Sequence, residues 1–189
     1  MIPLVKRDGM LHILFEVRSQ SIRQGGEICF PGGHIEGGET RAETAVRETR
    51  EELLLDPSQI CLIAPLHTMS NGPRGAEVSS FAGIIHHYED TGSSEEVERT
   101  FLLPLRKLME MQPIIYEADL KPVLPDDFPF DLIPGGRAYP WSGVRKKYYF
   151  YQTDEGVIWG MTAELLFHFL ETVRDYGVGN SDGKECGII

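Results

Sequence analysis

The chain has 189 residues, and its 29 acidic and 18 basic side chains give a formal net charge of −11. This length suits one domain with its own core, which we place at residues 1–176, before a mobile tail at 177–189. The acidic balance argues against nucleic acid or an anionic membrane as partner, because both select a basic surface. Three cysteines without zinc-ligand spacing indicate free thiols. With no signal segment and no apolar run of the roughly 20 residues that a membrane span needs, we expect a cytoplasmic protein.

Residues 1–30 carry strand signals. An apolar run at 11–17 is followed by a polar loop at 18–26 and by a second short strand at 27–30. A Pro-Gly-Gly sequence at 31–33 then ends that strand.

A helix is predicted to begin after Thr40, because Thr40 and Glu43 have the spacing of a capping box. At about 100° per residue the helix is amphipathic. One face gathers Ala42, Ala45, Val46, Thr49 and Leu53. A different face gathers Glu48, Glu51 and Glu52.

The three carboxylates of that second face predict a metal site. Crowded carboxylates repel one another unless a cation binds, and ligands that are all oxygen suit Mg²⁺ or Mn²⁺. Glycines just before the helix, at 32, 33, 37 and 38, let the backbone approach a ligand closely. The alternative is a solvated acidic face relieved by Arg47 and Arg50.

The middle of the chain predicts a hairpin. Strand-like segments at 58–69 and 77–87 are joined by a turn-rich segment at 70–75, so we expect the two strands to pair. A short strand at 101–105 leads into a brief helix that begins at Pro104 and ends near residue 111.

The last part of the chain alternates extended and helical signals. Residues 113–120 are predicted to be extended, and 147–152 to form a strand. Between them, 121–146 is rich in proline and aromatic residues, which favours a long ordered loop over a linker. Helical spacing of apolar residues over 162–176 predicts a packed helix.

Six positions around the predicted helix stand in a fixed register: Gly33, Glu39, Arg47, Glu48, Glu51 and Glu52. Their spacing closely resembles the Nudix box. Two positions depart from that pattern, since Thr49 stands where the family usually has an aliphatic residue and Leu54 where it has glycine. Glycine commonly ends a helix in the left-handed conformation. Leu54 therefore predicts that this helix runs on or ends differently.

The resemblance implies an α+β fold, a Nudix-type α/β/α sandwich with a mixed β-sheet between helices. It implies that Glu48, Glu51 and Glu52 hold the divalent ions and that Arg47, Glu51 and Glu52 act in catalysis. Arg47 would orient Glu39 or Glu51.

Two further roles follow from the same resemblance. Gly33, next to Gly32, would shape the loop before the helix.

The reaction that the resemblance implies is hydrolysis of a nucleoside diphosphate linked to another group. Such cleavage needs neutralised phosphate oxygens, an activated water and reacting groups held in line, all of which bound Mg²⁺ supplies. The general base stays open among Glu51, Glu52 and Glu96, and for Glu96 a solvated loop position is the alternative.

A second resemblance, to the signature that Nudix coenzyme A pyrophosphatases carry before their box, rests on Arg18, Ser19, Arg23, Gly26 and residues 30–33. Residues 158–163 resemble a segment near the end of such proteins. Two residues separate Arg23 from Gly26 where that signature has three, and Glu16 replaces a threonine. The resemblance implies that Arg18, Ser19 and Arg23 bind substrate, with the arginines on the phosphates of an adenosine 3′,5′-bisphosphate group. The alternative is that both arginines are simply solvated.

The leading hypothesis is therefore a Mg²⁺- or Mn²⁺-dependent diphosphatase for coenzyme A or its thioesters. Its products would be 3′,5′-ADP and a 4′-phosphopantetheine compound. A diphosphatase for ADP-ribose, a dinucleotide or a nucleotide sugar is the second hypothesis, and a catalytically silent ligand-binding module is the third. We expect a small nucleoside diphosphate derivative as partner, and a homodimer stays open.

Overall fold

A six-stranded mixed sheet forms the centre of the fold in the computed structural model, which describes residues 1–71 and 76–176. Its strands are β1 (Ile2–Arg7), β2 (Met10–Arg18), β3 (Ile28–Cys29), β4 (Ile60–Asn71), β5 (Ala76–Ile85) and β6 (Val97–Pro104). The order is β3-β2-β1-β5-β4, with β6 also paired to β2. β1 and β5 run parallel, and the other pairs are antiparallel. The predicted pairing of the strands at 58–69 and 77–87 is confirmed, while the turn between them falls largely outside the described residues.

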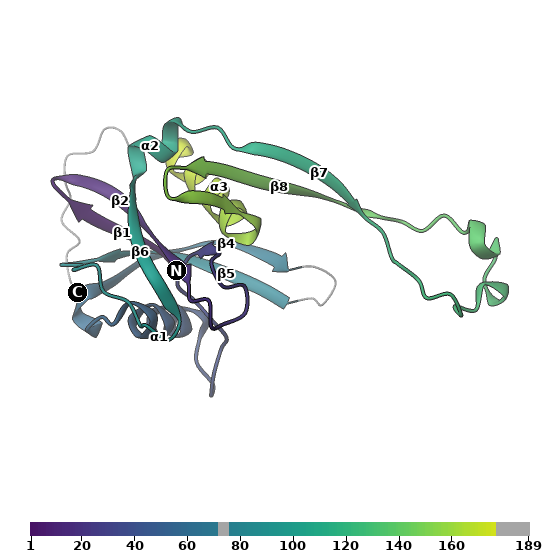
Figure 1. Cartoon of the computed structure of the whole chain (residues 1–189), viewed down its shortest axis with the longest axis horizontal. Coiled ribbons are helices and arrows are strands. Elements are labelled where there is room, and N and C mark those ends of the chain that lie inside the picture. Colours follow the sequence, from purple (N-terminus) through teal and green to yellow (C-terminus); the bar gives the residue numbers. More distant parts are fainter. Residues whose placement is uncertain (72–75, 177–189) are drawn as a thin grey trace.

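Helices lie on both sides of this sheet (Figure 1). Helix α1 (Arg41–Leu53) packs on one face, where Leu14 meets Ala45 and Leu53 in one apolar cluster. Helix α3 (Gly160–Asp175) packs on the other, where Ile13 and Phe15 join a larger cluster. Neighbouring residues of β2 thus serve opposite layers, because side chains alternate along a strand. The predicted α+β sandwich with a mixed sheet is confirmed.

Short elements connect these layers. A 3₁₀ turn, η1 (Pro57–Gln59), precedes β4, and helix α2 (Leu105–Glu110) follows Pro104 as predicted. Helix α3 begins two residues before its predicted start. Among residues 1–71 and 76–176, no helix is both long and apolar enough to cross a membrane. The expected tail at 177–189 lies outside the described residues.

A second, three-stranded sheet carries a long projection. Its strands are β7 (Ile114–Leu120), β8 (Val144–Thr153) and β9 (Gly156–Trp159), in the order β7-β8-β9. We call β7, β8 and the connection 121–143 the arm, and it extends well away from the body of the molecule (Figure 1). β8 begins at Val144, three residues before the predicted strand.

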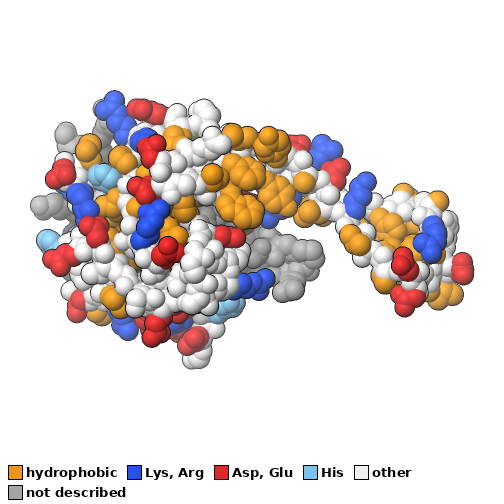
Figure 2. All heavy atoms as spheres, viewed as in Figure 1, with side chains coloured by type: hydrophobic (Ala, Val, Ile, Leu, Met, Phe, Trp, Pro, Cys, Tyr) orange, Lys and Arg blue, Asp and Glu red, His pale blue; other side chains and the backbone are white. Residues whose placement is uncertain are grey.

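The tip of the arm is held by its own aromatic side chains. The connection contains two 3₁₀ turns, η3 (Phe130–Leu132) and η4 (Gly136–Ala138). The Phe128 ring packs edge-on against Phe130 and Trp141, with ring centroids 5.0 and 6.0 Å apart, and Tyr139 packs against Trp141 at 5.0 Å. Apolar side chains nevertheless remain exposed along the arm and at its tip (Figure 2).

Candidate active site

Helix α1 begins as its sequence predicts. The Thr40 hydroxyl accepts a hydrogen bond from the amide of Glu43 at 3.2 Å, and the Thr40 amide donates to the Glu43 carboxylate at 2.8 Å. Just before it, Gly37 and Gly38 have φ values of +47° and +92°. A side chain would strain both positions, so the two glycines allow the turn that aims the chain into the helix.

The end of α1 corrects the expectation drawn from Leu54. Leu54 takes the left-handed conformation itself, with φ 54° and ψ 48°, and its amide donates to the carbonyl of Arg50. The Leu55 amide donates to the same carbonyl at 2.9 Å. Leu53 and Leu55 are both buried and fix the chain on either side of this residue. The helix therefore ends as it would with glycine, because burial of its neighbours offsets the strain at Leu54.

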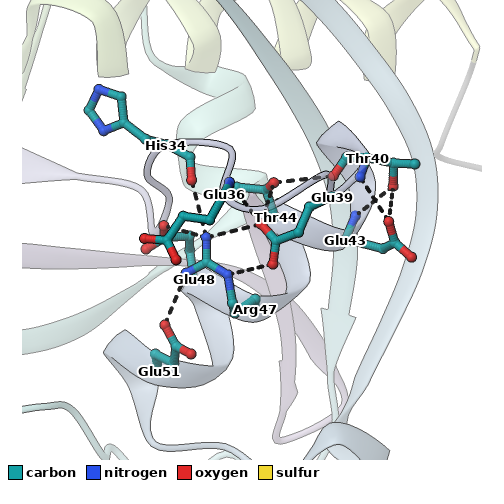
Figure 3. A network of polar contacts seen from close by, with 9 residues as sticks. All are labelled: His34, Glu36, Glu39, Thr40, Glu43, Thr44, Arg47, Glu48 and Glu51. Atoms are coloured by element: carbon teal, nitrogen blue, oxygen red, sulfur yellow. Dashed lines mark hydrogen bonds and ion pairs between the residues drawn. The ribbon is translucent and has the colours of Figure 1, made fainter.

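Arg47 is the centre of a network of carboxylates (Figure 3). Its Nε donates to Glu39 Oε1 at 2.7 Å, its Nη1 to Glu51 Oε2 at 3.1 Å, and its Nη2 lies 3.0 Å from Glu48 Oε1. Nη2 also donates to the carbonyl of His34 at 3.1 Å. One planar guanidinium thus ties the glycine-rich loop, residues 30–40, to the helix, which a point charge such as lysine cannot do.

Glu39 is fixed most firmly by this network. The hydrogen bond from Arg47, aided by one from the Thr44 hydroxyl at 3.0 Å, lowers the pKa of Glu39 to about 2. The Glu36 amide also donates to it, at 3.3 Å. Glu39 is therefore a permanently ionised anchor of the loop rather than a proton carrier.

Gly33 leaves room for the side chain of Glu48. A β-carbon at Gly33 would overlap the Glu48 carboxylate, with Oε2 only 2.7 Å away. The space is occupied by a carboxylate that has little freedom to withdraw, because Arg47 holds its other oxygen. This packing gives a physical reason for glycine at position 33.

Glu52 is buried on the sheet side of α1. It is 4% exposed, and its Oε2 accepts a hydrogen bond from the Gly32 amide at 2.8 Å. Burial, followed by the charge of Glu16, raises the pKa of Glu52 to about 8 against the effect of the Gly32 bond. Glu51, one residue earlier, has a side chain that is 51% exposed. The carboxylates expected on one face thus occupy three environments, with Glu48 between these two extremes.

Glu16 is a buried carboxylate near Glu52 that sequence reasoning did not single out. It lies on β2, is 1% exposed, and accepts a hydrogen bond from the thiol of Cys29 at 3.1 Å. Burial raises its pKa to about 7, and the nearby charge of Glu96 acts in the same direction. The available signal was a lone carboxylate inside the apolar run of β2, because glutamate is almost never fully buried without a partner.

The substrate-binding residues proposed from the sequence lie in a compact loop beside this carboxylate. The Ser19 amide donates to the carbonyl of Glu96 at 2.8 Å, which brings the loop and Glu96 together. Arg18 Nε donates to the carbonyl of Arg23 at 3.1 Å. Arg18 is therefore partly engaged inside the loop, whereas Arg23 is exposed.

A cavity of about 350 Å³ is lined in part by the glycine-rich loop. Its lining includes Phe30 and Gly33 from that loop, Arg41 from α1, and Met161 and Leu165 from α3. The two segments with a coenzyme A signature, at 30–33 and 158–163, thus contribute to one cavity.

The donor set fits a hard divalent cation. Within the described part of the chain, no three His, Cys, Asp or Glu side chains are already placed to hold a metal ion directly. The carboxylates of Glu16 and Glu52 nevertheless sit buried near each other, and the pKa of each is raised. The ammonium group of Met1 lies nearby and donates to the carbonyl of Pro31, but burial lowers its pKa to about 6. Oxygen ligands with excess negative charge suit Mg²⁺ or Mn²⁺, which keep several waters and need few direct protein ligands.

Comparison with known proteins gives a consistent result. A family model described as the NUDIX domain matches residues 2–126. Mouse peroxisomal coenzyme A diphosphatase NUDT7 is 33% identical over 116 residues, covering 59% of this chain and 48% of that protein. Human mitochondrial coenzyme A diphosphatase NUDT8 is 31% identical over 117 residues, covering 59% and 50%. The chain spans about half the length of these relatives.

A solved structure, a C. elegans Ap4A hydrolase binary complex, superposes with a TM-score of 0.48 at 20% identity, over 58% of this chain and 80% of that one. The family match is the stronger finding, since it covers well over half of the chain and includes the whole glycine-rich loop and α1. On that match, the chain belongs to the Nudix family.

Proposed function

We propose that this protein is a Mg²⁺- or Mn²⁺-dependent diphosphatase that cleaves coenzyme A or acyl-coenzyme A to 3′,5′-ADP and a 4′-phosphopantetheine product. The observation that carries the reaction type is the arrangement of α1. Glu48 and Glu52 are held against the glycine-rich loop, and Arg47 joins Glu39, Glu48 and Glu51 in one network.

Each side chain has a distinct task in this proposal. Glu48, Glu51 and Glu52 would hold the divalent ions, which when bound neutralise phosphate oxygens and lower the pKa of water. Arg47 orients Glu48 and Glu51 through its fixed fork of donors. The Gly32 amide orients Glu52 through its hydrogen bond.

The general base is proposed among Glu51, Glu52 and Glu96. A base must lie within hydrogen-bond reach of the water that it activates, and the Gly32 amide fixes the carboxylate of Glu52 at the site. Glu96 is exposed, and its charge acts on both Glu16 and Glu52. Glu96 is thus close enough to the buried carboxylates to stay a candidate.

The substrate class rests on the relatives and on the loop at 18–26. Two relatives are named as coenzyme A diphosphatases. In our proposal, Arg23 contacts the 3′-phosphate of the substrate, because its side chain is exposed. Arg18 and Ser19 would shape that loop and contribute to the same contact.

A substrate panel with Mg²⁺ or Mn²⁺ tests this proposal. Coenzyme A, ADP-ribose, a dinucleotide and a nucleotide sugar are compared, with products separated by chromatography. We expect 3′,5′-ADP from coenzyme A. Absence of that product alongside cleavage of ADP-ribose would move the assignment to the second substrate class, which the short Arg23–Gly26 spacing keeps open.

Dephospho-coenzyme A sharpens the test, since it lacks only the 3′-phosphate. Arg23→Ala should raise KM for coenzyme A by about tenfold and leave KM for the dephospho form unchanged. Arg106→Ala, in α2, is a matched control that removes an exposed arginine elsewhere. Equal effects of Arg23→Ala on both substrates would contradict the phosphate contact.

The departure of Leu54 from the Nudix pattern mildly favours the silent-module hypothesis, and the intact Glu48, Glu51 and Glu52 oppose it. Helix α1 ends at Leu54 in the left-handed conformation that glycine would adopt there, which weakens that argument. Lack of metal-dependent turnover across the whole panel would be required to return to it.

The remaining parts of the proposal concern the setting of the protein. We propose that residues 1–176 act as one Nudix domain in the cytoplasm, on a small nucleoside diphosphate derivative. Size-exclusion chromatography with light scattering decides between a monomer and the homodimer that the sequence left open.

A further inference from the structure

Glu16 occupies a place where a carboxylate is costly. It lies on β2 opposite Cys29 of β3 and Thr100 of β6, and it is 1% exposed. Leu14, two residues earlier on the same face of the strand, is fully buried among residues of α1. Glu16 therefore points toward α1, the helix that carries the acidic residues of the site.

One oxygen of this carboxylate has no partner. Oε1 accepts from the Cys29 thiol, a weak donor, whereas Oε2 is buried and makes no hydrogen bond within residues 1–71 and 76–176. A buried acceptor without a donor costs free energy, and more so when it carries charge. Such a group needs an explanation in terms of function.

Arg18 lies near Glu16 but points its donors elsewhere. Arg18 directs Nε to the carbonyl of Arg23, and its Nη1 lies 4.0 Å from the sulfur of Cys29. No ion pair joins Arg18 to Glu16 among the contacts of the described residues. Its positive charge is felt at Glu16 only over a distance.

Charges of both signs surround Glu16. The positive charges of Arg18 and of the Met1 ammonium group lower its pKa, whereas the charge of Glu96 raises it. Burial lowers the pKa of the Met1 ammonium group to about 6, which favours the neutral amine at higher pH and leaves the carboxylates uncompensated by it. Glu52 of α1 and Glu96 before β6 both lie close enough for charge repulsion with Glu16 or with each other. Two buried carboxylates with an unfilled acceptor between the sheet and α1 form a site that a cation would stabilise.

We propose that Glu16 is a further carboxylate of the divalent-cation site, with its free oxygen accepting from the hydration shell of a cation held by Glu48 and Glu52. The inference rests on the metal-dependent function proposed above. Contact through the hydration shell agrees with the lack of three directly converging ligands among the described residues, since Mg²⁺ usually keeps several waters. The coenzyme A signature has threonine at this place, so the carboxylate distinguishes this chain from that pattern.

Titration of the protein with Mn²⁺, followed by the electron paramagnetic resonance signal of the free ion, tests this role without any substrate. Glu16→Gln keeps the shape of the side chain and removes its charge. We expect about tenfold weaker Mn²⁺ binding, the size of effect that groups around a metal's direct ligands usually have. Glu98→Gln, which removes the same charge from an exposed position on β6, should bind Mn²⁺ as the wild type does.

Thermal unfolding separates a metal-site role from a structural one. Without metal, Glu16→Gln should be at least as stable as the wild type, because it removes a buried charge. With Mn²⁺, its melting temperature should rise less than that of the wild type. If the role of the Glu16 carboxylate were purely structural, Glu16→Gln would instead lower the melting temperature by the same amount with and without Mn²⁺. Glu16→Thr repeats the comparison with the residue of the coenzyme A signature, and it decides the matter where the glutamine variant does not fold.

Glu48→Gln distinguishes failure of this inference from failure of the proposed function. Weak Mn²⁺ binding by Glu48→Gln with wild-type binding by Glu16→Gln would overturn the role of Glu16 and leave the metal site in place. No Mn²⁺ binding by the wild type would overturn both. Weakened binding in the variants of both residues supports the inference.

Discussion

The active-site region buries acidic side chains, whereas the arm exposes apolar ones, and both depart from the usual distribution in a folded protein. Around α1, Glu16 and Glu52 are acidic groups almost fully removed from water. On the arm, Val123 and Leu132 are apolar groups that are 97% and 81% exposed. Burying the acidic groups costs electrostatic free energy, and leaving the apolar groups exposed gives up hydrophobic stabilisation.

The two regions differ in what holds them. The carboxylates of the site are positioned by groups from distant parts of the chain, such as the Gly32 amide on Glu52 and the Arg47 side chain on Glu39. The tip of the arm is held by rings from within its own connection, as in the contact of Phe128 with Trp141. The site should therefore depend on the integrity of the body, and the body should not depend on the tip of the arm, residues 121–143.

The largest effect is expected at Glu52. Glu52→Gln keeps the side-chain shape and the bond from the Gly32 amide. It removes the negative charge that would bind a metal ion or accept a proton. We expect kcat to fall by at least about a hundredfold, with an unchanged far-ultraviolet circular dichroism spectrum. Glu110→Gln in α2, an exposed position, is the matched control. Near-normal turnover of Glu52→Gln would refute its place in the metal site.

The second effect concerns Arg47. Arg47→Lys keeps the charge but cannot reach Glu39, Glu48 and Glu51 together. Turnover should fall by about tenfold or more, with weaker Mn²⁺ binding, because the carboxylates lose their fixed positions. Arg50→Lys, on the exposed side of the same helix, should behave as wild type. Equal losses in both variants would point to general destabilisation of α1.

Stability against pH provides the third test, on protein freed of metal. The pKa of Glu52 is raised by burial to about 8 from an ordinary value of 4.5, so the folded state retains a proton that the unfolded state releases. Stability from this group is complete below about pH 4.5 and is lost as the pH rises to about 8. Glu52→Gln has no such loss. Its stability relative to the wild type should rise across that window.

The comparison with Glu52→Gln isolates the ionisation of Glu52 together with its interactions with neighbouring groups. Glu16, Glu48, Glu96, Arg18 and the Met1 ammonium group face the same region in both proteins, and the charge of Glu52 acts on Glu16 and on the Met1 ammonium group. Chemical denaturation at several pH values measures the difference in stability between the two proteins. A stability difference that stays constant from pH 4.5 to 8 would contradict the raised pKa of Glu52.

The sequence predicted those features that depend on neighbouring residues. The capping box placed the start of α1, and the period of apolar residues placed α3. The approach of Glu16 to Glu52 could not be predicted, because it depends on how β2 faces α1. The conformation of Leu54 depends likewise on the burial of Leu53 and Leu55. Local propensity favoured the wrong outcome there, and tertiary packing decided it.

Leu54 offers a smaller, stabilising effect. Leu54→Gly should raise the free energy of unfolding by about 1 kcal/mol, since the left-handed conformation costs a residue with a β-carbon roughly that much. Little packing is lost, because Leu54 is 61% exposed. For a chain of this size the melting temperature should rise by about 2–4 °C. Leu54→Ala retains the β-carbon and should not show this gain, and turnover should be unchanged in both variants.

The smallest effect is expected from removing the tip of the arm. Replacing residues 121–143 by Asn-Gly joins Leu120 directly to Val144, which already pair across β7 and β8, through a tight hairpin turn. Since the aromatic rings of the tip pack on one another, the melting temperature should change by no more than about 2–4 °C, the shift that corresponds to about 1 kcal/mol. Mn²⁺ binding should be unchanged. A large drop in the melting temperature or in Mn²⁺ affinity would show that the tip supports the body. The tip would then not be an independent unit held only by its own aromatic rings.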